Sequence, residues 1–315
     1  MKVIEFLESS STTLLSYEII PPLRGGTARF IFDLVEELMP YEPPFIDITS
    51  RSAEVYDEKL ADGTVRRRVR RKRPGTIGLS AAIKNRYNVE TVPHLLCRGF
   101  TREETEDALI ELNYLGIDNV LAVTGDDTGR GNPGNEDDTV NRYANELVEQ
   151  IVNMNRGIYL EALEDSHPTD FCIGVGGYPE KHRESPDLDA DVGFLKKKVD
   201  AGAHYIVTQM FFDNSAYFPF VERCRGAGID IPIIPGLKIL TSKRHLTMLP
   251  EIFDVKVPEP LASRVREASG KEVKQIGIEW ALNQCQELLE ARVPCIHFYI
   301  MQDAATVTRI VSQIR

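Results

Sequence analysis

The chain has 315 residues, of which 42% are hydrophobic and 27% are charged, and its formal net charge is −11 at pH 7. This composition is ordinary for a soluble globular protein and excludes disordered and fibrous classes. The negative charge argues against a protein whose whole surface binds nucleic acid or another polyanion. The length suits one large domain or two average ones.

The N-terminal segment does not resemble a signal peptide, because Glu5 and Glu8 interrupt its apolar residues. No later run is long enough to span a membrane, so we expect a cytoplasmic protein that does not bind membranes. The 5 cysteines and 6 histidines are scattered, without a C-x-x-C or H-x-x-x-H pair. This spacing predicts reduced, buried thiols and no metal site.

Apolar runs typical of strands alternate with helical patterns along the whole chain. We expect strands at residues 14–20, 45–49, 92–97, 119–124, 171–176, 205–211, 231–235 and 295–300. We expect helices at residues 28–39, 80–90, 101–115, 139–153, 187–200, 214–227, 241–249, 271–291 and 303–314. Three prolines in residues 250–270 leave that segment without an assignment.

Almost continuously apolar strands that alternate with helices indicate a parallel sheet. Eight such units favour a (β/α)8 TIM barrel over a doubly wound open sheet, which is the alternative. No linker or change of composition divides the chain. We therefore predict a single barrel domain over residues 1–315.

Glu18 lies inside the first of these strands, in the sequence SYEIIPP at residues 16–22. Pro21 and Pro22 end the strand because proline cannot donate to a sheet. Functional residues collect where parallel strands end, and a glutamate without a role is rare in a buried strand. A glutamate held by a salt bridge at the rim explains the pattern equally well, and both interpretations stay open here.

Polar residues at or just past the other strands are expected on the same face of the barrel. They are Thr49, Ser50, His94, Asp126, Tyr178, Gln209, Lys238 and Tyr299. Gly174, Gly176 and Gly177 let a flat ligand approach the fifth strand, although glycine is equally typical of a bulge there. In the following helix, Asp191 and Lys198 lie together beside the apolar stripe, where a polar pair is normally solvent-exposed.

Two loops have unusual composition. Residues 54–73 contain Asp62 and Gly63 between short strand patterns, which predicts a hairpin, and end in the basic run RRRVRRKR at residues 66–73. We interpret this run as a solvated arm or an oligomer contact rather than a nucleic-acid site, because aromatic residues are not interleaved with it. Residues 125–134 contain G-x-G-x-x-G, but Pro133 and the adjacent acids argue against a dinucleotide fingerprint and favour a flexible acidic loop.

Ordered motifs through most of the chain resemble those of one family. They are SYEIIPP at 16–22, PHLLC at 93–97, GIDNV at 116–120 followed by TGD at 124–126, YPEKH at 178–182, KVDAGA at 198–203, TQMFFD at 208–213, IPG at 234–236 and HFY at 297–299. Together they resemble the methylenetetrahydrofolate reductase family, flavin-dependent enzymes that make 5-methyltetrahydrofolate.

The resemblance implies a (β/α)8 barrel that holds FAD at the carboxyl ends of its strands. NADH or NADPH would reduce the flavin, and 5,10-methylenetetrahydrofolate would reoxidise it in a ping-pong reaction. Glu18 resembles the general acid that opens the methylene bridge of the folate. Asp126 resembles the carboxylate beside the flavin that also touches the pterin, and Gln209 resembles the amide that both substrates contact. His245 matches a folate-contacting position that is frequently glutamine in relatives.

Further positions match residues that contact FAD in the family. They are Thr49, Ser50, His94, Thr124, Gly125, Asp126, Tyr143, Ala144, Tyr178, His182, Asp191, Lys197 and Lys198. The resemblance also implies a homo-oligomer. The chain ends about where the barrel ends, so we expect no regulatory domain for S-adenosylmethionine.

Two rival functions remain. Lys238, just past the seventh strand, suits a Schiff-base barrel of the aldolase type if burial lowers its pKa. The basic run at residues 66–73 suits a non-catalytic protein that binds nucleic acid. If the family assignment holds, the same run is a speculative site for the folate tail. The choice between NADH and NADPH stays open.

Overall fold

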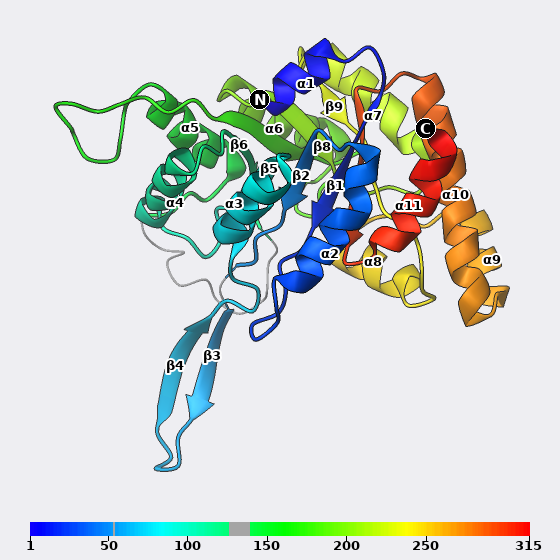
Figure 1. Ribbon diagram of the computed structural model, residues 1–315, viewed down its shortest axis with the longest axis horizontal. Helices are drawn as coiled ribbons and strands as arrows, with labels where there is room; N and C mark the ends of the chain where they lie inside the picture. The colour runs from blue at the N-terminus through cyan, green and yellow to red at the C-terminus, as the bar shows by residue number, and fades with distance from the viewer. Residues whose placement is uncertain (53, 126–138) are drawn as a thin grey trace.

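The computed structural model describes residues 1–52, 54–125 and 139–315 (Figure 1). Asp126, which we expected beside the flavin, and most of the glycine-containing loop at residues 125–134 therefore lie outside the described residues.

The described strands form one parallel, nearly closed barrel and a separate hairpin. The barrel order is β10-β11-β1-β2-β5-β6-β7-β8-β9. Its strands are β1 (Leu14–Ile19), β2 (Phe45–Ile48), β5 (Glu90–Leu96), β6 (Asn119–Val123), β7 (Cys172–Gly177), β8 (Tyr205–Thr208), β9 (Ile233–Ile234), β10 (Gly236–Leu237) and β11 (Cys295–Met301). This confirms the predicted (β/α)8 barrel.

Pro235 divides one predicted strand into β9 and β10. Ile234 pairs with Val207 of β8, whereas Gly236 pairs with His297 of β11. Proline has no backbone N–H to donate, but the Pro235 carbonyl accepts a hydrogen bond from the His297 backbone nitrogen at 2.9 Å. The two short strands together therefore occupy one position in the ring and close it.

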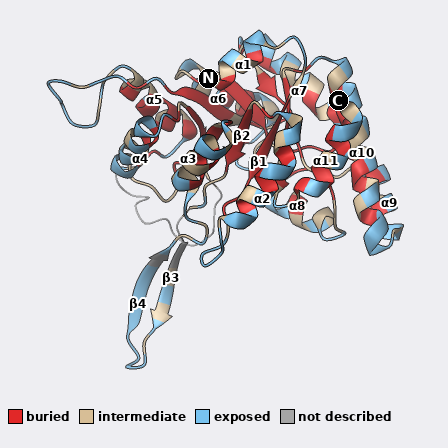
Figure 2. Ribbon diagram, viewed as in Figure 1, coloured by how far each residue is buried: buried red, intermediate tan, exposed pale blue. Residues whose placement is uncertain are grey.

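Helices surround the barrel, and their inner faces are buried against it (Figure 2). They are α1 (Val3–Ser9), α2 (Arg29–Leu38), α3 (Thr76–Tyr87), α4 (Arg102–Tyr114), α5 (Ala144–Asn155), α6 (Leu188–Asp200), α7 (Asn214–Gly226), α8 (His245–Phe253), α9 (Glu259–Glu267), α10 (Gly270–Glu290) and α11 (Ala304–Ile314). A capping box of Thr101 and Glu104 is present at the start of α4.

Two helices were not predicted. In α9, Pro258 is the N-cap and Pro260 lies in the first turn, where the missing N–H does not break a helical hydrogen bond. Both prolines therefore favour the start of a helix at this point. The other helix, α1, is short and depends on tertiary packing. Three expected helix starts were also wrong: α3 begins at Thr76 rather than 80, α5 at Ala144 rather than 139, and α8 at His245 rather than 241.

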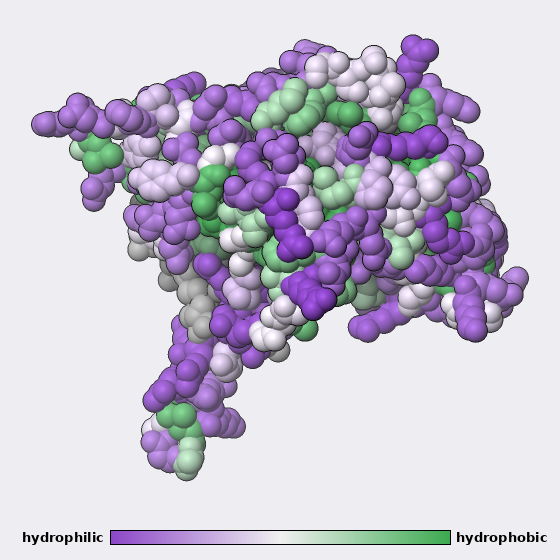
Figure 3. Space-filling view, viewed as in Figure 1, coloured by the Kyte–Doolittle hydropathy of each residue, from purple (hydrophilic) through white to green (hydrophobic). Residues whose placement is uncertain are grey.

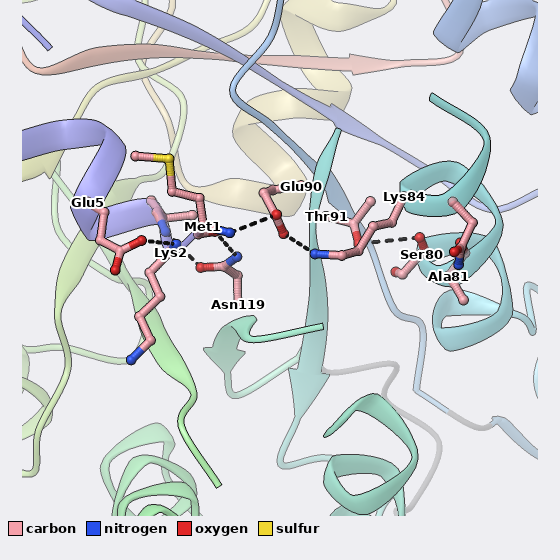
Figure 4. A network of polar contacts seen from close by, with 11 residues as sticks. Met1, Lys2, Glu5, Ser80, Ala81, Lys84, Glu90, Thr91 and Asn119 are labelled. Carbon is pink, nitrogen blue, oxygen red and sulfur yellow. Dashed lines mark hydrogen bonds and ion pairs between the residues drawn. The ribbon is translucent and has the colours of Figure 1, made fainter. Parts of the chain in front are cut away.

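Helix α1 covers the amino end of the barrel. Its Val3 and Leu7 side chains are buried in a cluster with residues of the strands, including Phe45 and Val92. The network in Figure 4 fixes this helix: the Met1 amino group lies 2.8 Å from Glu90 Oε1, and the Val3 backbone nitrogen donates to Asn119 Oδ1 at 2.7 Å. The carboxyl end is therefore the end available for a site.

The predicted hairpin is present as β3 (Glu54–Lys59) and β4 (Val65–Arg70), which pair antiparallel and project from the barrel (Figure 1). Its turn contains Gly63 at φ +81°, a conformation that favours glycine. The five cysteines are all buried and reduced, as the sequence predicted. Among the described helices, none is long and apolar enough to cross a membrane.

Candidate active site

Three ionisable side chains from adjacent strands meet inside the carboxyl end of the barrel. Glu18 of β1 lies level with Asp47 of β2 in the sheet register, and His94 comes from β5, the next strand. His94 Nε2 lies 3.4 Å from Asp47 Oδ1 and 3.8 Å from Glu18 Oε2. The exposed fractions are only 8% for Glu18, 1% for Asp47 and 8% for His94. The imidazole thus lies between two buried carboxylates.

The two carboxylates determine the charge of the imidazole. Burial alone would lower the pKa of His94, but the hydrogen bond to Asp47 and the charges of Glu18 and Asp47 outweigh it and raise the pKa. A protonated His94 can donate a proton toward either carboxylate. Asp47 Oδ2 is buried and has no hydrogen-bond partner among the described residues.

Residues of β11 and Lys238, which follows β10, lie next to this cluster. The buried His297 has its Nδ1 2.8 Å from Ser16 Oγ, and burial lowers its pKa to about 4. Lys238 Nζ donates to the Tyr299 carbonyl at 2.7 Å. Burial lowers the pKa of Lys238 to about 8, although the charges of Glu18 and Asp303 oppose the shift. Lys238 is therefore still mostly cationic at pH 7, and its charge interacts with that of Glu18.

Gln209 follows β8, and His245 is the first residue of α8. The Gln209 side-chain oxygen accepts a hydrogen bond from the Met210 backbone nitrogen at 2.9 Å, which orients the amide at the end of β8. His245 begins α8, and its Nδ1 accepts from the Thr241 nitrogen at 3.3 Å. Burial and the charge of Lys238 lower the pKa of His245. Its imidazole is therefore neutral at pH 7.

Polar residues follow β2 and β6, the two strands on either side of β5. Thr124 and Gly125 follow β6 and are half-buried, as is Ser50 after β2. Thr49 Oγ1 and Ser52 Oγ are buried without a hydrogen-bond partner among the described residues. Buried hydroxyls are normally paired, so both atoms can accept or donate a further hydrogen bond.

The end of β7 provides an open backbone, and Lys198 of α6 brings a half-buried cation to it. A Cβ at Gly176 would have no neighbour closer than the Tyr178 hydroxyl at 3.8 Å, so this glycine leaves room for a ligand. Lys198 Nζ contacts the Gly176 carbonyl and lies 5.9 Å from the centre of the Tyr178 ring. Burial lowers the pKa of Lys198 to about 8 despite the charge of Asp191.

Two of the predicted FAD-contacting residues organise the loop between β7 and α6. Asp191 accepts hydrogen bonds from Ser185 Oγ at 2.6 Å and from the His182 backbone nitrogen at 3.3 Å. The His182 ring packs edge-on against Tyr178 with 4.6 Å between ring centres. Burial lowers the pKa of His182. Asp191 therefore fixes this loop, rather than lying exposed beside the apolar stripe.

The remaining predicted residues lie farther out. Tyr143 is 63% exposed and caps α5, which begins at the buried Ala144. Lys197 is exposed and lines a groove of about 540 Å³ between α5 and α6, together with Asn145, Glu149 and Asp200. These positions belong to α5, α6 and their ends, whereas the cluster around Glu18 belongs to β1, β2 and β5.

Asp47 is the residue that sequence reasoning missed. The signal was present, because Asp47 interrupts the apolar run FIDIT at residues 45–49 in the same way that Glu18 interrupts its own strand. Two acids inside neighbouring parallel strands indicate a shared site more strongly than either acid alone.

Comparison with known proteins places this chain in a family. Residues 2–315 match the family described as methylenetetrahydrofolate reductase. The chain belongs to this family.

Three relatives of this methylenetetrahydrofolate reductase family chain illustrate the match. It is 28% identical over 302 residues to methylenetetrahydrofolate reductase 1 of Schizosaccharomyces pombe, with 95% of this chain and 45% of the relative aligned. It is 30% identical over 318 residues to methylenetetrahydrofolate reductase (NADH) 1 of Arabidopsis thaliana, covering 96% and 48%. It is 28% identical over 293 residues to the 5,10-methylenetetrahydrofolate reductase of Escherichia coli, covering 92% and 86%.

The chain therefore spans about half the length of the yeast and plant relatives, and most of the bacterial one. A solved structure supports the fold. An uncharacterized protein from Clostridium thermocellum that binds two copies of 5-methyl-5,6,7,8-tetrahydrofolic acid superposes with a TM-score of 0.56 at 13% identity, covering 98% of this chain and 95% of that one.

Proposed function

We propose that the protein reduces 5,10-methylenetetrahydrofolate to 5-methyltetrahydrofolate with NADH or NADPH as the hydride donor and FAD as the intermediate carrier. The observation that carries the proposal is the buried cluster of Glu18, His94 and Asp47 at the carboxyl end of a barrel from this family. A cluster that can store and donate a proton is what the folate half of the reaction needs.

The residues at the barrel mouth fit FAD. The unpaired hydroxyl of Thr49 and the hydroxyl of Ser50 would contact polar atoms of the cofactor, and the open backbone at Gly176 suits a flat ring. Lys198, and Lys197 farther out, would face its phosphates. When bound, FAD accepts a hydride from the nicotinamide and gives it to the folate.

Glu18 supplies the proton in this proposal. Opening the methylene bridge of the folate requires protonation of the amine nitrogen that leaves, and Glu18 Oε2 would donate that proton. The reaction consumes one hydride from NAD(P)H and one proton per turnover. His94 Nε2, 3.8 Å from Glu18 Oε2, would return a proton to the carboxylate, and Asp47 would keep His94 protonated and oriented.

Gln209, His245 and Asp126 complete the proposed folate site. Gln209 carries an oriented amide at the end of β8, and His245 presents a neutral imidazole beside Lys238. The role of Asp126 beside the flavin stays a prediction from the family resemblance, because this residue lies outside the described part of the chain.

The test separates the two half-reactions of a Glu18→Gln variant. The purified protein should be yellow, and NADH should bleach it under anaerobic conditions. Glu18→Gln should keep FAD and still be bleached, because the amide has nearly the same shape. Its reoxidation by methylenetetrahydrofolate should slow by about 100-fold or more, since a general acid contributes that much.

The control is Glu37→Gln, at an exposed position of α2. It should behave as the wild type in both half-reactions. A colourless protein that does not take up FAD would exclude the proposal. Loss of FAD from Glu18→Gln would instead assign Glu18 a structural role.

The lowered pKa of Lys238 supports one alternative function. A buried lysine with a pKa of about 8 has the property that a Schiff-base enzyme of the aldolase type requires. Borohydride trapping of a carbonyl substrate on Lys238, in a protein without flavin, would favour that function. Family membership favours the reductase.

A further inference from the structure

Lys238 is a charged residue in an unusual place. Charged side chains normally lie on the surface, and Figure 3 shows a face of the molecule that is mostly hydrophilic. Lys238 instead follows β10 at the carboxyl end of the barrel and is half-buried. A lysine that has lost part of its hydration needs compensating partners. The groups around its ammonium therefore indicate what this lysine does.

The direction of the Lys238 side chain follows from the strand that precedes it. Gly236 of β10 faces the interior, because a Cβ at this position would lie 2.6 Å from Cε2 of the Tyr299 ring. Side chains two residues apart along a strand point to the same side. Accordingly, Lys238 Nζ donates to the Tyr299 carbonyl at 2.7 Å. The ammonium group is thus held against the backbone of β11.

Tyr299 separates the lysine from Glu18 by its backbone, not by its ring. The strand order β10-β11-β1 puts Tyr299 between the two residues, and its backbone pairs with Glu18 in the sheet register. The ring lies over Gly236, and the hydroxyl donates to the Thr208 carbonyl at 2.6 Å. The ring therefore points away from Glu18, toward β8.

The charges of Lys238 and Glu18 act on each other across Tyr299. Burial lowers the pKa of Lys238 to about 8, and the charge of Glu18 opposes this shift. Coupling between two sites is reciprocal, so the lysine cation favours the ionised form of Glu18 to the same extent. Tyr299 adds no charge, because burial raises its pKa well above the ordinary value.

A second cation lies on the other side of Glu18. His94 of β5 is 3.8 Å from Glu18 Oε2, and the hydrogen bond to Asp47 of β2 helps to raise its pKa. In the strand order β10-β11-β1-β2-β5, Glu18 of β1 therefore stands between His94 and Lys238. His94 is the cation that can pass a proton to Glu18, whereas Lys238 acts on Glu18 by its charge.

Two further ionisable groups face Lys238 from the segments after β11 and β10. The charge of Asp303 also acts on Lys238, and Asp303 pairs with Lys274 at 3.2 Å. Burial and the charge of Lys238 lower the pKa of His245, so this imidazole is neutral at pH 7. Asp303 is thus shared with another lysine, and His245 adds no cation near Glu18.

We propose that Lys238 is a positioning residue that makes Glu18 a stronger acid, because its cation stabilises the carboxylate that remains after proton transfer. The inference rests on the proposed function. In that step the proton moves from the Glu18 carboxyl to the leaving amine nitrogen of the methylene bridge, the carbon–nitrogen bond breaks, and the negative charge stays on Glu18. Lys238 keeps its own proton and acts through Glu18 rather than through a contact with substrate.

A titration of the protein without folate tests the coupling. NMR of isotopically labelled lysines follows the Lys238 ammonium group, whose signal is identified by its absence from Lys238→Arg. In Glu18→Gln, Lys238 should titrate about one pH unit lower than in the wild type, because the opposing carboxylate is gone. Glu37→Gln, at an exposed position of α2, is the control and should leave the titration unchanged. An unchanged titration of Lys238 in Glu18→Gln would overturn the proposal.

The pH dependence of the folate half-reaction tests the consequence. Reoxidation of the flavin by methylenetetrahydrofolate should slow at high pH, where Glu18 loses its proton. In Lys238→Met, Glu18 should keep its proton to a higher pH, so this decline should move up by about one pH unit. Below the decline the variant should be slower than the wild type, because a weaker acid transfers its proton more slowly. Lys238→Arg keeps the cation and should restore the wild-type profile.

The matched control is Lys271→Met, which removes a lysine at an exposed position in the first turn of α10 and should have the wild-type profile. A Lys238→Met protein with the wild-type profile would overturn the proposal. Complete loss of activity at every pH in both Lys238→Met and Lys238→Arg would instead assign Lys238 a covalent role. A yellow protein that reduces the folate but shows no coupling would overturn this proposal alone. A protein that does not take up FAD would exclude the proposed function and this proposal with it.

Discussion

At the scale of single residues, the site depends on whether each buried charge has a partner of opposite charge. Asp47 is 1% exposed, and such a carboxylate is stable only with a partner of opposite charge. His94 provides that partner, and its raised pKa is the electrostatic consequence. The same imidazole also lies beside Glu18. The protonated His94 therefore connects the proposed acid, Glu18, with Asp47.

Asp47→Asn should lower the pKa of His94, because it removes the charge and the hydrogen bond that raise it. The imidazole would then lose its proton at a lower pH than in the wild type. A pH titration of isotopically labelled histidines by NMR measures this shift directly in the protein without substrate. FAD content should be unchanged, while reoxidation by the folate slows.

Asp33→Asn, an exposed position in α2, is the control for that experiment and should leave the titration of His94 unchanged. An Asp47→Asn protein with the wild-type pKa at His94 would show that Asp47 neither holds nor orients the imidazole.

At the scale of secondary-structure elements, close backbone contacts position the helices around the barrel. Gly277 of α10 lies against the Leu240 backbone, and a Cβ at this position would collide with the Leu240 carbonyl oxygen. Gly193 of α6 has nothing within 4 Å of the equivalent point. Both glycines lie inside helices, but only at Gly277 does the packing leave no room for a side chain.

Gly277→Ala should therefore lower the free energy of unfolding by about 1–3 kcal/mol, because α10 must move away from Leu240. Gly193→Ala should raise it by about 0.5–1 kcal/mol, because alanine favours an exposed helix interior. Urea denaturation of both variants measures the two changes. Equal effects in the same direction would show that helix propensity alone governs both positions.

At the scale of the whole molecule, the two ends of the barrel have different tasks. Helix α1 closes the amino end with Val3 and Leu7, and the carboxyl end holds the ionisable cluster. The molecule thus separates a stabilising end from a reactive end, as TIM barrels generally do.

Leu7→Ala should lower the free energy of unfolding by about 2–3 kcal/mol, because it leaves a cavity between α1 and the strands. Glu8→Ala, at the exposed neighbouring position, should change stability by less than about 0.5 kcal/mol. Thermal and urea unfolding compare the two. An equal, small effect of both substitutions would mean that α1 does not close the barrel.

The fold was predictable from sequence because the strands and most helices carry strong local patterns. The helices α9 and α1 were missed because their stability depends on position and packing. In α9, Pro260 lies where proline is tolerated, and α1 is stable through the buried contacts of Val3 and Leu7. The extent of a single domain over residues 1–315 stays a prediction, as do the roles of the site residues.

The sequence by itself determined the eight-unit barrel, the hairpin and the family, because alternating apolar runs and ordered motifs are local features of the chain. Only the tertiary structure decided that Asp47 joins Glu18 and His94, and that Asp191 holds a loop. The reason is physical: burial, pKa and pairing depend on neighbours that strand order brings together from distant positions in the chain.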